Sequence, residues 1–141
     1  MTALRHLHST MAYILLAALL VSILITFFAY LKKKPFTEGN RKIALIGFIS
    51  AHLQFLIGLI IYFASPLGVS NFSGENMKNS LARLYMLEHP LTMIVAIALI
   101  TIGYIKAKKA SVDIVKYNKI LLFYTLGLIL ILTRIPWMVW P

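Results

Sequence analysis

Three of the four histidines lie on different hydrophobic segments, and they are the residues of this sequence best suited to chemistry. His8 opens the first long hydrophobic segment, His52 lies well inside the second, and His89 lies within the third. A neutral imidazole in an apolar environment needs a hydrogen-bond partner or a metal ion. Imidazole nitrogen is also the usual axial ligand of a b-type haem in a helical bundle. The three histidines are therefore candidate ligands of haem iron, and their alternative role is to hydrogen-bond neighbouring helices.

Charged residues near the third and fourth segments would complete such a site. Lysine-rich loops follow the first and third hydrophobic segments. Counted along the helices from these loops, the expected depths of Glu88, His89 and Arg134 in the membrane differ by no more than ~5 Å. A Glu88–Arg134 ion pair is therefore feasible, and it would lower the cost of burying either charge. Alternatively, Arg134 with Arg83 and Arg5 would hold haem propionates, because guanidinium groups pair well with carboxylates. The simpler interpretation of Arg5 and Arg83 is that their long side chains reach the membrane surface.

The three histidines differ in their expected depth. Counted from the same loops, His52 lies ~10 Å closer to the lysines than His89, and His8 lies ~9 Å farther away. Two axial ligands must reach one iron from opposite sides at nearly the same depth. Pro90 removes a backbone hydrogen bond and predicts a bend beside His89, which together with helix tilt would reduce the mismatch. A His8–His89 pair and a His52–His89 pair therefore both stay open.

Four long hydrophobic segments must position these residues. The chain has 141 residues, of which 60% are hydrophobic and 13% charged, whereas a soluble domain has about a quarter charged residues. About 20 apolar residues cross a hydrocarbon core of ~30 Å. The sequence predicts an all-α integral membrane protein, an up-down four-helix bundle forming a single transmembrane domain over residues 1–141. Its predicted spans are residues 10–30, 43–64, 81–105 and 120–139.

We expect the first segment to be a retained span. Its apolar stretch is too long for the hydrophobic region of a typical signal peptide, and no small-residue cleavage site follows Tyr30.

Lysine and arginine residues predict how the bundle is oriented. Ten of them lie in or beside two loops, the one after the first segment and the one after the third. Only four lie on the opposite side of the membrane. The positive-inside rule then places both of these loops in the cytoplasm and both termini on the outer side. The formal charge of +10 therefore indicates contact with anionic lipid rather than with nucleic acid. The ten are Lys32, Lys33, Lys34, Arg41, Lys42, Lys106, Lys108, Lys109, Lys116 and Lys119.

Four short motifs are spread along nearly the full chain. They are Arg5-His6-Leu7-His8-Ser9, Ala51-His52-Leu53-Gln54 with Leu56-Ile57-Gly58, Glu88-His89, and Ile135-Pro136-Trp137. Together they resemble a family of small four-helix bacterial membrane proteins labelled cytochrome B or b-type cytochrome-like.

This resemblance implies a haem b carried by His8, His52 and His89, and electron transfer beside quinone or a redox partner protein. It also implies a location in the bacterial inner membrane, with both termini periplasmic. His6 has no clear counterpart in the motif and is left out of the site. The chain has no cysteine, so the haem would be bound non-covalently.

Two other functions fit parts of the pattern. In a transporter or channel for protons, metal ions or a small solute, His8, His52, Glu88 and His89 would form a polar path. The half of the bundle nearer the lysine-rich loops offers few intramembrane polar groups, which argues against this. In a structural subunit of a larger complex, the polar residues would serve packing alone, and a homo-oligomer is compatible with the short loops. No hydrolase motif appears, and whether the chain is an enzyme stays open.

Overall fold

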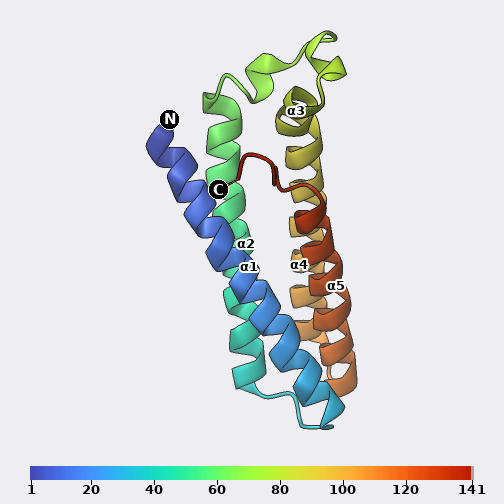
Figure 1. Ribbon diagram of the computed structural model, residues 1–141. Coiled ribbons are helices and arrows are strands. Elements are labelled where there is room, and N and C mark those ends of the chain that lie inside the picture. The colour runs from blue at the N-terminus through green and yellow to red at the C-terminus, as the bar shows by residue number, and fades with distance from the viewer. Residues whose placement is uncertain (141) are drawn as a thin grey trace.

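Four long helices build the structure, a computed structural model that describes residues 1–140 (Figure 1). Each helical segment is long and apolar enough to cross a membrane, and α4 extends a helical stretch that begins at Ser80. Residues 1–140 contain no β-strand. The predicted all-α four-helix bundle is therefore confirmed. The long helices are α1 (Thr2–Leu31), α2 (Glu38–Ala64), α4 (His89–Lys109) and α5 (Asp113–Thr133).

The four helices alternate in direction, and each packs against two neighbours: α1 lies between α2 and α5, and α4 completes the ring (Figure 1). We call one end of the bundle the basic end; it holds the connections 32–37 and 110–112. The other end, the terminal end, holds the N-terminus, residues 134–140 and the long connection 65–79. His8 and His89 both lie toward the terminal end because each is near the start of its helix there.

The fourth segment differs from its prediction at both ends. The first three predicted spans lie within helical stretches, but α5 begins at Asp113 rather than 120 and ends at Thr133 rather than 139. It starts earlier because polar residues such as Lys116 and Lys119 continue the helix beyond the apolar stretch. It ends earlier because Pro136 disfavours helical conformation in the residue before it. Residues 134–140 instead fold back across the terminal end (Figure 1).

Large apolar side chains cover the outer surfaces of the helices. Leu20, Leu56, Leu91 and Leu122 are each about half exposed, from 50 to 56%. An apolar surface of this extent on four long helices indicates a lipid-bilayer environment.

Small residues allow the helices to approach closely in the middle of the bundle. A methyl group added to Gly47 would lie 3.1 Å from the Ser22 hydroxyl and 3.2 Å from the Tyr124 ring. Both of these side chains are fully buried, and both donate hydrogen bonds to backbone carbonyls of α2. The Ser22 hydroxyl reaches Ile43 at 2.9 Å, and the Tyr124 hydroxyl reaches Ala44 at 2.5 Å. The middle of the bundle is thus held by close packing and satisfied hydroxyls.

A π-helical turn at Leu84–Glu88 (η3) joins the short helix α3 (Ser80–Arg83) to α4. Pro90 is responsible for part of this irregularity, because it has no N–H to donate to the carbonyl of Met86. The Tyr62 hydroxyl of α2 donates to that carbonyl instead, at 3.0 Å. The bend that Pro90 predicts therefore takes the form of a π-turn that a neighbouring helix stabilises.

Candidate functional site

His8 of α1 and His89 of α4 lie opposite each other near the terminal end. Their ring centroids are 6.3 Å apart, and the two ring planes are nearly perpendicular, at 78°. Counting helix rise overestimated their separation, because α1 is inclined across the bundle (Figure 1) and the π-turn shifts the start of α4. The structure thus brings together one of the two histidine pairs that the sequence left open.

A backbone carbonyl fixes the orientation of His89. Its Nδ1 lies 2.8 Å from the carbonyl oxygen of Arg134, which follows the end of α5. Since a carbonyl oxygen only accepts hydrogen bonds, Nδ1 carries the hydrogen and Nε2 keeps its lone pair. Backbone carbonyls that accept the other ring hydrogen impose the same arrangement on histidines that ligate metals.

His8 packs against α2 at Gln54 and Gly58, and two buried polar atoms there are unsatisfied within the described part of the chain. The Gln54 amide nitrogen donates to the His8 backbone carbonyl at 2.9 Å and lies 3.4 Å from its Nε2. Within residues 1–140, the buried His8 Nδ1 and Gln54 Oε1 have no hydrogen-bond partner. Gly58 makes room for the ring, since a methyl group there would lie 3.2 Å from His8 Cε1. Buried polar atoms without partners are uncommon and mark places where water or a ligand completes the structure.

Glu88 forms ion pairs with two arginines beside the histidine pair, at the terminal end of the bundle. Its carboxylate oxygens lie 2.7 Å from Arg83 Nε and 3.5 Å from Arg134 Nε, so the predicted Glu88–Arg134 pair is confirmed. Arg83 also donates to the carbonyl of Met77 at 2.9 Å. Sequence analysis missed the pairing with Arg83, because residues five apart face different directions on a regular α-helix. The π-turn between them brings both side chains to one face.

His52 takes part in a separate set of contacts deeper in the bundle. Its Nδ1 donates to the carbonyl of Phe48 at 2.7 Å, and its Nε2 lies 3.1 Å from the Thr101 hydroxyl. Thr101 is twelve residues along α4 from His89, a distance of ~18 Å. The structure therefore does not bring His52 to the His8–His89 pair. The Thr101 hydroxyl near its Nε2 also donates to the carbonyl of Ile97, at 2.7 Å.

Two other residues that the sequence analysis considered, Arg5 as a candidate and His6 as one left out of the site, lie at the surface. The side chains of Arg5 and His6 are exposed on the first turns of α1. Neither residue takes part in a side-chain hydrogen bond or ion pair with another residue of the described part of the chain. The sequence-based preference for a surface role of Arg5 therefore agrees with its position.

Comparison with protein-family models, with curated proteins and with solved structures finds no match to this chain. The geometry of the site must therefore carry the functional inference. Residues 1–140 hold no group of three or more His, Cys, Asp or Glu side chains suited to a bare metal ion. Two facing imidazoles are instead the number that axial ligation of a haem iron requires.

Proposed function

We propose that this chain is a membrane b-type cytochrome-like protein that binds a non-covalent haem b for electron transfer, with His8 and His89 as axial ligands. The observation that carries this proposal is the 6.3 Å between their ring centroids. Two imidazoles that bind one metal ion from opposite sides have centroids about 6 Å apart, because each metal–nitrogen bond is about 2 Å long. The centroid spacing therefore supports an iron shared by the two rings, although it also lies in the range of ordinary edge-to-face packing.

The hydrogen bonds of the two rings also fit this role. The carbonyl of Arg134 leaves His89 Nε2 as the ligating nitrogen, and it raises the basicity of the ring by accepting the Nδ1 hydrogen. The His8 Nε2 makes one long contact, with the Gln54 amide nitrogen at 3.4 Å, which iron ligation would replace at small cost. The buried His8 Nδ1, unpartnered among residues 1–140, also marks this ring as incompletely satisfied.

The charges beside the pair suit the propionates of a haem. Arg83 and Arg134 share the single carboxylate of Glu88, so this group of three carries one net positive charge. Guanidinium groups bind carboxylates well, so we assign both arginines to the propionates. When bound, the haem would supply reversible one-electron exchange.

The proposed partners and location follow from the charge distribution and the resemblance together. We infer a bacterial inner membrane with the basic end in the cytoplasm and the terminal end in the periplasm. The haem would then lie nearer the periplasmic surface, where a quinone in the membrane or a periplasmic redox protein can approach it.

An optical spectrum tests the proposal most directly. Protein purified in detergent from a haem-replete host should show a Soret band and, after dithionite reduction, the sharp α and β bands of low-spin haem. The His6→Ala variant, altered at an exposed histidine two residues from His8, should keep the same spectrum. A featureless spectrum from folded protein supplied with haem would set the proposal aside and favour a solute path or a packing role for the histidines.

A further inference from the structure

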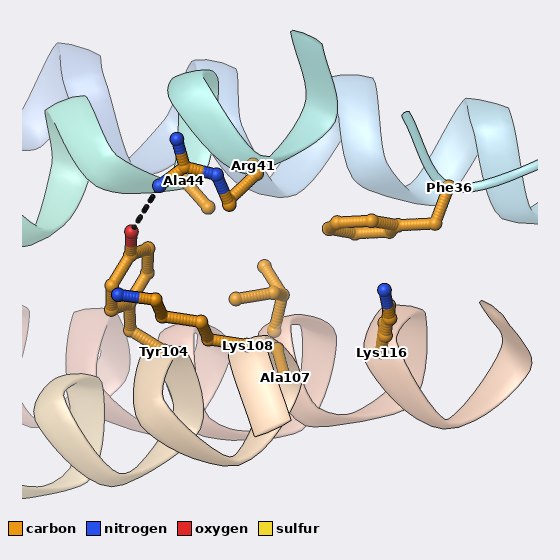
Figure 2. A pocket seen from close by; sticks show the side chains of 8 residues that line it. Phe36, Arg41, Ala44, Tyr104, Ala107, Lys108 and Lys116 are labelled. Carbon is orange, nitrogen blue, oxygen red and sulfur yellow. Dashed lines mark hydrogen bonds between the residues drawn. The ribbon is translucent and has the colours of Figure 1, made fainter. Parts of the chain in front are cut away.

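A partly enclosed cavity of about 40 Å³ lies at the basic end, where α2, α4 and α5 meet the connection before α2 (Figure 2). This volume holds about three water-sized groups, which is the size range of the oxygens of a small oxyanion. It is lined by Phe36, Arg41, Ala44, Tyr104, Ala107, Lys108, Lys116 and Ile120.

Three cationic side chains from three helices surround the cavity. Arg41 of α2 donates to the hydroxyl of Tyr104 at 3.1 Å, which directs its guanidinium toward α4 (Figure 2). Lys116 of α5 lies over the ring of Phe36, with its Nζ 5.5 Å from the ring centroid. Lys108 of α4 lines the same space. Cationic side chains from three helices thus line one cavity, with the Lys108 amine beside Tyr104 and the Lys116 amine beside Phe36 (Figure 2).

The positive charge of this cluster is only partly neutralised. Glu38 pairs with Arg41, but no ion pair within residues 1–140 includes Lys108 or Lys116. Asp113, one turn before Lys116, lines a different and larger cavity beside α1. Two cations therefore face one cavity without a matching carboxylate, and an added anion would relieve their repulsion.

We propose that this cavity binds a phosphate group, either that of an anionic phospholipid headgroup or that of a small soluble phosphate compound. Arg41 already directs Nε and Nη2 at Glu38 and Nη1 at Tyr104, so it would supply positive charge and its remaining N–H donors, and the two lysines would supply point charges. The cavity lies at the last turn of α4 and the first turns of α2 and α5, where the headgroups of a bilayer are found. This inference does not depend on haem binding.

Lipid selectivity of the full chain tests the proposal. We would measure the affinity for phosphatidylglycerol by native mass spectrometry of protein released from mixed phosphatidylcholine vesicles. The Lys108→Gln/Lys116→Gln variant should lose about fivefold more affinity per lysine than its control variant, because each would lose a charge-assisted contact with the phosphate worth about 1 kcal/mol, whereas the general attraction to an anionic surface is removed equally from both variants. The matched control is Lys106→Gln/Lys109→Gln, which removes the same charge from the same region but outside the cavity.

A second arm separates the two sources of phosphate. Glycerol 3-phosphate and inorganic phosphate are titrated in a phosphatidylcholine-only background, with thermal unfolding as the readout. Stabilisation that the Lys108→Gln/Lys116→Gln variant abolishes would assign a soluble phosphate compound, and selectivity for phosphatidylglycerol alone would assign the lipid. Equal losses in both double variants, or no binding in either arm, would overturn the proposal.

A variant expected to bind phosphate more tightly distinguishes a real loss of binding from a loss caused by misfolding. Glu38→Gln frees Arg41 from its carboxylate partner, so phosphate binding should strengthen severalfold. The haem spectrum should stay unchanged in all of these variants, which keeps a failure of this inference distinguishable from a failure of the proposed haem site. Weaker binding in Glu38→Gln would contradict the assignment of Arg41 as a phosphate ligand.

Discussion

The two ends of the bundle satisfy their polar groups in different ways. At the terminal end, Gln54 bonds His8, His89 bonds the carbonyl of Arg134, and Glu88 pairs with two arginines, one of them from α4's own helical stretch. At the basic end, most charged side chains are exposed; Arg41 reaches the Tyr104 hydroxyl of α4, but its ion pair with Glu38 lies on a single helical turn. The histidine pair and Glu88 of the terminal end are therefore bonded to other residues of the chain, whereas most charged side chains of the basic end are left to water and headgroups.

This difference bears on which end can hold a cofactor. Polar groups within a span are costly and persist where they have partners or a function. Charges at a helix end are solvated and contribute little to stability, but they set orientation and lipid contact. Single substitutions should therefore have large effects at the terminal end and small effects at the basic end.

The largest expected effect is on haem binding. His8→Ala and His89→Ala should each abolish the low-spin spectrum, because each removes one of two axial ligands. His52→Ala should keep it, since His52 bonds Phe48 and Thr101 instead. Reduced-minus-oxidised spectra of the three variants decide this. A spectrum lost in His52→Ala and kept in His8→Ala would reverse the assignment and move the site toward the middle of the bundle.

The next largest effect should come from Tyr62→Phe. Its hydroxyl is the donor to the carbonyl of Met86, a residue with no exposed surface, and Pro90 cannot take its place. Leaving a buried carbonyl unsatisfied costs about 1–3 kcal/mol, so the free energy of unfolding should fall by about 2 kcal/mol. The measurement is an SDS or thermal unfolding titration in mixed micelles.

Tyr30→Phe is the matched control for this variant, because Tyr30 contributes a ring contact with Tyr117 at the basic end. It should unfold like the unaltered protein. Similar losses in both variants would show that the Tyr62 hydroxyl does not specifically hold the π-turn.

The sequence predicted the fold well because hydropathy and charge are one-dimensional signals. Long apolar runs broken by lysines identify helical spans whatever their packing, and only α5 stops short of its predicted span, at Thr133 rather than 139. The similar depth of Glu88 and Arg134 was predicted for the same reason, since helix rise is regular along α4 and α5. The ion pair between them follows from that regularity.

The rest of the site depends on features that spacing does not contain. The His8–His89 contact requires the inclination of α1, and the Arg83–Glu88 pair requires a π-turn. The partner of His89 is a backbone carbonyl, which residue type does not reveal. Pro90 was the one feature of the sequence that pointed to the irregular turn before α4, because it leaves the carbonyl of Met86 without its usual backbone donor.

A smaller effect is expected from Glu88→Gln. Removing this carboxylate leaves Arg83 and Arg134 as neighbouring unpaired cations, but all three side chains are 31 to 45% exposed, so water compensates part of the loss. We expect the free energy of unfolding to fall by about 1 kcal/mol. Glu75→Gln is the control at the same end, since no ion pair within residues 1–140 includes Glu75. Equal stability of the two variants would show that the Glu88 group does not hold the terminal end together.

The smallest effect should come from Glu38→Gln, the counterpart of Glu88→Gln at the basic end. The Glu38 side chain is 60% exposed, and its partner Arg41 keeps a second contact with the Tyr104 hydroxyl. Exposed ion pairs on one helical turn are screened by water and salt, and the first turn of α2 is held separately by the capping box of Thr37 and Asn40. The unfolding midpoint should therefore match that of the unaltered protein at both low and high salt. A loss of stability as large as that of Glu88→Gln, which added salt reduces, would contradict this prediction. It would mean that ion pairs stabilise both ends of the bundle in the same way.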